Sequence, residues 1–135
     1  MTDVFFDSNI LLYLVSGDKG KASRAEELIG ARGVISVQVL NEFVAVAVRN
    51  ALLKFHEIRE ILSTIRGLCT VRPVDITTHE LALDLSEQRH FSIYDALIVA
   101  AALQAQCTVL YTEDLQHNQR IGGLTIRNPF VGQPN

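Results

Sequence analysis

The sequence predicts an α/β domain in which helices cover both faces of a parallel sheet. Short apolar segments of strand length alternate with longer segments of helical periodicity along the 135 residues, and strands separated by helices are typical of parallel sheets. No repeat, low-complexity tract or linker interrupts this alternation. The length is that of one ordinary domain, so a single domain over residues 1–135 is expected.

The first half of the chain is expected to form two strands and four helices. The strands are short and apolar, at residues 4–6 and 34–35. The helical patterns span residues 10–15, 22–31, 37–50 and 56–66. The polar residues between the first two helices, 17–21, are expected to form a loop, and Ser36 is placed to cap the third helix.

The second half continues the alternation. Strands are expected at residues 69–74 and 108–111, with a further one at 124–126, and helices at residues 77–89 and 92–105. The last of these helices is apolar on nearly every face, which predicts that it is buried.

The composition describes a globular protein of the cytoplasm. Hydrophobic residues make up 48% and charged residues 20%, which argues against disorder. The apolar run over residues 96–103 is far shorter than the ~20 residues of a membrane span, the N-terminus has no basic segment of a secretory signal, and two cysteines suit a reducing compartment. We therefore expect no membrane partner. The formal net charge of −3 excludes a protein that binds nucleic acid through bulk positive charge.

Four acidic residues are predicted to meet at one edge of the sheet. Asp7 follows the first strand directly, and Asp114 follows the fourth. Asp95 lies in the first turn of the buried helix, and Glu42 lies within the apolar third helix. Because parallel strands present their carboxyl ends at one edge, where such sheets bind ligands, we expect these carboxylates to lie together.

This grouping favours a hard metal ion. Carboxylates gathered without basic side chains repel one another unless a cation lies between them. Oxygen ligands with no Cys or His nearby suit Mg²⁺ or Mn²⁺, and such ions support the cleavage of phosphodiester bonds.

Each acid also has an ordinary structural explanation. Asp7 stands where an Asp often caps the following helix, and Asp95 stands three residues after Ser92, which resembles a capping box. Glu42 shares a helical stripe with polar residues, as a solvated face would. The acid after the fourth strand could be a simple loop residue.

The segments around the four acids resemble PIN-domain ribonucleases, and among them the VapC-like toxins of type II toxin–antitoxin pairs. The resemblance covers nearly the whole chain and rests on FDSNIL at 6–11, NEF at 41–43, IYDALI at 93–98 and LYTEDL at 110–115. It implies a three-layer α/β/α fold with a parallel sheet of four or five strands.

The resemblance also implies the functional residues. The catalytic, metal-binding acids would be Asp7, Glu42, Asp95 and Asp114, with Mg²⁺ or Mn²⁺ as the cofactor. Glu113 is the rival for the last of these positions. Ser8 and Asn9 would orient the acids through hydrogen bonds, and Thr112 would support the metal or a water.

The implied activity is that of a metal-dependent endoribonuclease, with transfer RNA or a ribosomal RNA loop as the candidate substrate. A cognate antitoxin would be its protein partner, and a homodimer its assembly. The alternative is a catalytically silent PIN-fold module that binds RNA or the antitoxin. The basic residues considered for contact with RNA are Lys19, Lys21, Arg24, Arg120 and Arg127.

Two positions differ from related sequences, which often have glycine there. Gln106 follows the buried helix, and Asn118 lies in the last predicted loop. We expect left-handed backbone at both positions. This costs a residue such as Gln on the order of 1 kcal/mol, whereas Asn tolerates the conformation better than most.

Overall fold

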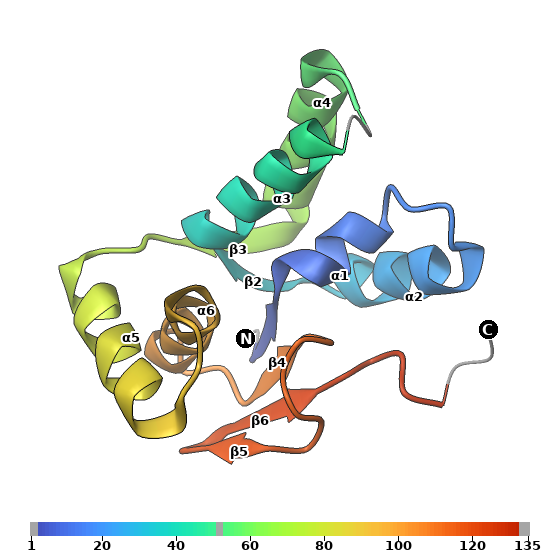
Figure 1. The fold of residues 1–135 in the computed structure, drawn as a ribbon. Coiled ribbons are helices and arrows are strands. Elements are labelled where there is room, and N and C mark those ends of the chain that lie inside the picture. Colours follow the sequence, from blue (N-terminus) through green and yellow to red (C-terminus); the bar gives the residue numbers. More distant parts are fainter. Residues whose placement is uncertain (1–2, 51–52, 133–135) are drawn as a thin grey trace.

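A six-stranded sheet forms the centre of the protein, in the order β3-β2-β1-β4-β6-β5 (Figure 1). The computed structural model describes residues 3–50 and 53–132. The strands are β1 Val4–Phe6, β2 Gly33–Ser36, β3 Cys69–Arg72, β4 Val109–Tyr111, β5 Arg120–Ile121 and β6 Leu124–Arg127. Neighbouring strands are parallel except for the antiparallel pair β5–β6.

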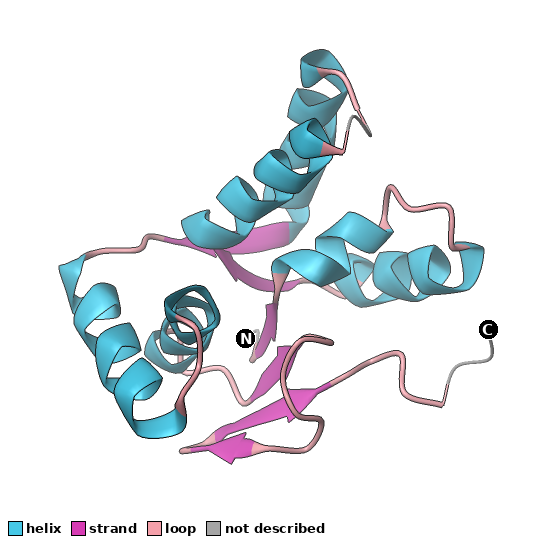
Figure 2. Cartoon of the chain, in the orientation of Figure 1, coloured by secondary structure: helices cyan, strands magenta, loops and turns pink. Residues whose placement is uncertain are grey.

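Helices lie on both sides of the sheet, as the predicted three-layer arrangement requires. They are α1 Ser8–Tyr13, α2 Lys19–Gly30, α3 Val37–Arg49, α4 Phe55–Leu68, α5 Ile76–Arg89 and α6 Ile93–Gln104. Figure 2 shows α1 and α2 on one side of the sheet, and α5 and α6 on the other. Helices α3 and α4 form a pair that projects beyond the sheet.

The core is built on the central strands and on α6. Phe5, Phe6 and Leu110, on the neighbouring strands β1 and β4, are fully buried. Residues 98–102 of α6 are buried as well. This confirms the prediction for the apolar helix: alanines on most of its faces leave room for close packing on all sides.

Two local predictions were wrong. Helix α2 begins at Lys19, inside the segment expected to be a loop, because the Asp18 side chain accepts a hydrogen bond from the Lys21 backbone N–H and caps the helix early. The strand Arg120–Ile121 was not predicted, since two residues are too short to show a periodic pattern. It adds an antiparallel edge to a sheet whose other five strands are parallel.

No helix in the described ranges 3–50 and 53–132 is long and apolar enough to cross a membrane. Both cysteines, Cys69 and Cys107, are buried free thiols. Burial raises the pKa of each thiol to about 11. At neutral pH they therefore remain protonated parts of the core.

Left-handed backbone occurs, as expected, at both positions where related sequences often have glycine. Gln106 has φ 58° and Asn118 has φ 68°. The first ends α6, where its N–H donates to the Leu103 carbonyl at 3.0 Å. The backbone of Gln106 is therefore held in a conformation that glycine adopts at lower cost.

Replacing Gln106 with glycine should stabilise the protein. We expect Gln106→Gly to raise the free energy of unfolding by about 0.5–1 kcal/mol. This net gain is the relief of left-handed strain in the folded protein, reduced by the greater chain entropy that glycine gives the unfolded protein. Urea unfolding measures the change. Gln88→Gly, within α5, is the matched control and should destabilise the protein, since glycine there has no positive φ to relieve. Equal losses in both variants would contradict the strain at Gln106.

Candidate active site

Asp7 lies at the centre of the candidate site. It follows β1 and caps α1, where its Oδ1 accepts a hydrogen bond from the Ser8 backbone N–H at 2.6 Å. Its Oδ2 accepts one from the Thr112 hydroxyl at 2.8 Å. The residue is only 3% exposed. The capping explanation and the site explanation are therefore compatible, because one carboxylate both ends the strand and lies at the carboxyl edge of the sheet.

Ser8 connects Asp7 to Glu42. Its hydroxyl lies 3.0 Å from Glu42 Oε1 and 3.3 Å from Asp7 Oδ1, so one donor is shared between two carboxylates. Gln38 Nε2 donates to Glu42 Oε2 at 3.2 Å. Glu42 thus lies toward the other acids, and Gln38 supports it one helical turn earlier. The i, i+4 spacing of these two residues is visible in the sequence, where a solvated stripe was the alternative to a site acid.

Asn9 connects Asp7 to Asp114. Its amide Nδ2 lies 3.1 Å from Asp114 Oδ2, 3.2 Å from Thr112 Oγ1 and 3.5 Å from Asp7 Oδ2. The Thr112 hydroxyl also accepts a hydrogen bond from the Asp114 backbone N–H at 3.1 Å. The structure therefore places Ser8, Asn9 and Thr112 among the acids, where the resemblance implied them.

Asp95 approaches the same group from α6. The Ser92 hydroxyl caps this helix by accepting from the Asp95 backbone N–H at 3.1 Å. The Asp95 carboxylate does not complete a capping box with the Ser92 backbone. Burial, followed by the negative charge of Asp114, raises the pKa of the Asp95 carboxyl. A hydrogen bond with the Ser92 side chain opposes this increase. The Asp95 carboxylate thus lies beside the cap of its helix and within electrostatic reach of Asp114.

Burial also raises the pKa of the Asp7 carboxyl, from 3.8 to about 6. Hydrogen bonds from Thr112 and Ser8 oppose the increase, while the charges of Glu42 and Asp114 add to it. Keeping Asp7 ionised at neutral pH therefore costs free energy in the folded protein.

The acids have no basic partner. None of the ion pairs among the described residues involves Asp7, Glu42, Asp95 or Asp114. As placed, no group of three or more Asp, Glu, His or Cys side chains in ranges 3–50 and 53–132 is arranged to hold a metal ion. Instead, Ser8 and Asn9 lie between the carboxylates as hydrogen-bond donors.

The chemistry of the acidic side chains nevertheless fits Mg²⁺ or Mn²⁺. The available ligand atoms are carboxylate oxygens, which these ions prefer. A cation would also offset the charges of Glu42 and Asp114, which add to the increase that burial causes in the pKa of Asp7. The Asn9 Oδ1 atom is buried and has no hydrogen-bond partner among the described residues, so it leaves a further oxygen acceptor next to the acids.

Glu113 and Asp114 are neighbours in sequence but lie in different surroundings. Glu113 accepts a hydrogen bond from the Tyr13 hydroxyl at 2.6 Å and pairs with Lys21 at 3.5 Å. Asp114 contacts Asn9. Of the two candidates for the fourth acid, the structure therefore brings Asp114 to the others. No sequence signal identified Tyr13, because its partner lies 100 residues away.

Two of the basic residues considered for RNA contact are in ion pairs. Lys21 pairs with Glu113, and Arg24 pairs with Glu27 at 3.0 Å. The other three form no ion pair within the described part of the chain. Lys21 is thus a structural cation, and the remaining positive charge is on the surface.

The sequence matches the PIN domain family over residues 4–121. The chain belongs to the PIN domain family. This confirms the resemblance drawn from the four acidic segments. A comparison with curated protein sequences finds no match.

Solved structures of VapC toxins and toxin–antitoxin complexes share the fold. A toxin–antitoxin complex from Klebsiella pneumoniae has a TM-score of 0.71 at 21% identity, over 93% of this chain and 97% of that one. Mycobacterium tuberculosis VapC20, described as a sarcin-ricin loop cleaving toxin, has a TM-score of 0.67 at 18% identity, over 82% of this chain and 89% of that one. VapBC2 from Rickettsia felis, bound to a DNA fragment from its promoter, has a TM-score of 0.66 at 18% identity, over 92% and 96%.

The raised pKa of Asp7 predicts a stability change that depends on pH. Because its folded pKa exceeds the unfolded value, its contribution to stability is most favourable below pH 4 and is lost as pH rises through about 6. Asp7→Asn keeps a capping side chain and removes the buried charge. We expect it to raise the free energy of unfolding by about 1–3 kcal/mol at pH 7.5 without divalent metal, and by much less at pH 4.

Urea unfolding across this pH range measures the effect. Asp84→Asn, at an exposed position of α5, is the control and should show no comparable gain. An equal gain for Asp7→Asn at pH 4 and pH 7.5 would show that the charge is not its cause.

Proposed function

We propose that this PIN-domain chain is a metal-dependent endoribonuclease that hydrolyses RNA phosphodiester bonds and acts as the toxin of a type II toxin–antitoxin pair. One observation carries the proposal: Ser8 and Asn9 link Asp7 to Glu42 and Asp114 by hydrogen bonds, and Asp95 lies within electrostatic reach of Asp114. None of these four acids has a basic ion-pair partner among the described residues. Family membership supports this assignment.

In the proposed reaction Asp7, Glu42, Asp95 and Asp114 would hold Mg²⁺ or Mn²⁺. When bound, the ion would activate a water and stabilise the negative charge that develops at the phosphate and its leaving oxygen. The chain would contribute the arrangement of the carboxylates, which the hydrogen bonds of Ser8, Asn9 and Thr112 hold in place.

The cost of the Asp7 charge favours an enzyme over a catalytically silent module. A module that only binds RNA or an antitoxin would need a cap for α1, which Asn or Ser also provides, but not a buried charge that opposes folding at neutral pH. Stability given up at a site is typical of active centres.

The proposed partners follow from the structural neighbours. The Klebsiella pneumoniae structure is described as a toxin–antitoxin complex, and VapC20 is described as a sarcin-ricin loop cleaving toxin. We propose a cognate antitoxin as the protein partner of this chain, and transfer RNA or a ribosomal RNA loop as its substrate. A homodimer in the cytoplasm remains our prediction for its assembly and location.

Cleavage of total RNA by the purified, antitoxin-free protein tests the proposal. We expect discrete fragments with Mg²⁺ or Mn²⁺ and none with EDTA. Asp7→Asn and Asp95→Asn should each lower the rate at least about 100-fold, since losing a ligand costs more than losing an outer hydrogen bond. Both variants should remain folded by circular dichroism.

Asp84→Asn is the matched control on the surface and should cleave like the parent. Retained activity in Asp95→Asn would remove Asp95 from the catalytic set. A folded parent protein that cuts no RNA with either metal would favour the silent binding module.

A further inference from the structure

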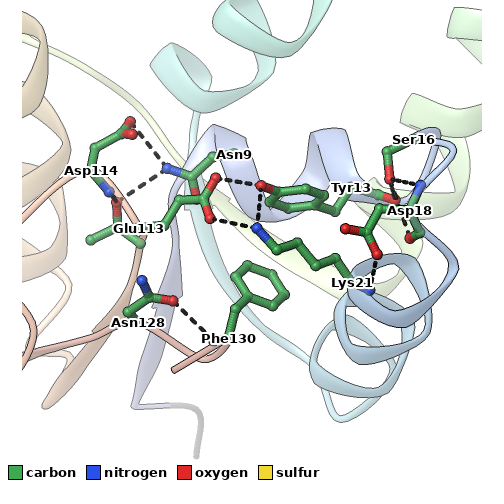
Figure 3. Close-up of polar contacts among 10 residues, drawn as sticks. Asn9, Tyr13, Ser16, Asp18, Lys21, Glu113, Asp114, Asn128 and Phe130 are labelled. Carbon is green, nitrogen blue, oxygen red and sulfur yellow. Dashed lines mark hydrogen bonds and ion pairs between the residues drawn. The ribbon is translucent and has the colours of Figure 1, made fainter. Parts of the chain in front are cut away.

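Tyr13, Lys21 and Glu113 form a compact polar cluster beside the acids, called here the Tyr13 brace. The Tyr13 hydroxyl donates to Glu113 Oε1 at 2.6 Å and accepts from Lys21 Nζ at 3.0 Å. Lys21 Nζ also lies 3.5 Å from Glu113 Oε2. In Figure 3 the three side chains close this triangle between α1, α2 and the loop after β4.

Aromatic packing holds the brace from the other side. The rings of Tyr13 and Phe130 meet edge to face with centroids 4.8 Å apart. Lys21 Nζ lies 4.8 Å from the Tyr13 ring centroid and 5.3 Å from that of Phe130. The side chains of Lys21 and Glu113 are 30% and 26% exposed, so partial burial strengthens this pair relative to one in open solvent.

The brace determines which way the loop after β4 presents its two acids. Figure 3 shows Glu113 turned toward Tyr13, while Asp114 is turned toward Asn9. Asn9 and Tyr13 are four residues apart on α1, so they lie on one face of the helix. One face of α1 therefore holds Glu113 through Tyr13 and Asp114 through Asn9.

We propose that Tyr13 is a positioning residue that draws Glu113 away from the acids and thereby places Asp114 in the metal site. This inference rests on the proposed function and deepens it. Without the Tyr13 hydroxyl, Glu113 loses its short hydrogen bond and keeps the longer ion pair with Lys21. The loop that carries both acids is then held less firmly. Asp114 then spends less time beside Asn9, and the acids hold a cation less well.

Tyr13→Phe tests the proposal because it removes the hydroxyl and keeps the ring against Phe130. We expect Mn²⁺ affinity, measured by isothermal titration calorimetry, to fall about 10-fold, and RNA cleavage to fall by a similar factor, as is usual when an outer hydrogen bond to a metal site is lost. Tyr111→Phe is the matched control, since the Tyr111 hydroxyl has no hydrogen-bond partner among the described residues. It should match the parent in both measurements.

A double-mutant cycle separates positioning from a simple structural role. If Tyr13 acts through Asp114, Tyr13→Phe should cause no further loss of Mn²⁺ affinity in an Asp114→Asn background. Glu113→Gln keeps an acceptor for the tyrosine and should lose less affinity than Glu113→Ala. If Tyr13→Phe fails to fold, the Mn²⁺ affinities of the two Glu113 variants test the same positioning role.

Parental Mn²⁺ affinity in Tyr13→Phe, or a full additional loss in the Asp114→Asn background, would overturn the positioning role. The two hypotheses fail separately. A parent protein that binds Mn²⁺ but cuts no RNA would contradict the proposed function, while the calorimetric cycle would still test Tyr13.

Discussion

The structure depends on one electrostatic constraint: carboxylates must be held close together without a basic partner among the described residues. This constraint acts chiefly on Asp7. This residue ends the central strand β1, which pairs with both β2 and β4, and it starts α1 as the capping residue. Hydrogen bonds from Thr112, Ser8 and Asn9 converge on it. The start of α1 and the loop after β4, which lie far apart in the sequence, are thereby joined at one carboxylate.

This arrangement places stability and function in opposition. Burial raises the pKa of Asp7 to about 6, so the charge opposes folding at neutral pH. The core offsets this cost in stability, because β1, β4 and the alanine-rich α6 contribute buried apolar side chains to one hydrophobic cluster. A rigid core of this kind can hold a strained polar edge in one geometry.

Much of the fold could be predicted because its signals are local. Alternating apolar segments located five of the six strands, and the caps at Ser36 and Ser92 lie where their sequence predicts. The failures have local causes as well. Asp18 extends α2 back to Lys19 through one hydrogen bond, and Arg120–Ile121 becomes a strand only because β6 lies alongside it.

The sequence by itself determined the α/β class and the family and pointed to Asp7, Glu42 and Asp95 as candidate site acids, because strand ends and motif spacing are read directly from residue order. Only the tertiary structure decided which neighbour in the Glu113–Asp114 pair joins those acids, and that Lys21 supports the loop rather than standing free. Both outcomes depend on Tyr13, which meets Glu113 across 100 residues of chain. Contacts at that separation arise from packing of α1 and α2 against the loop after β4, and no periodicity in the sequence encodes them.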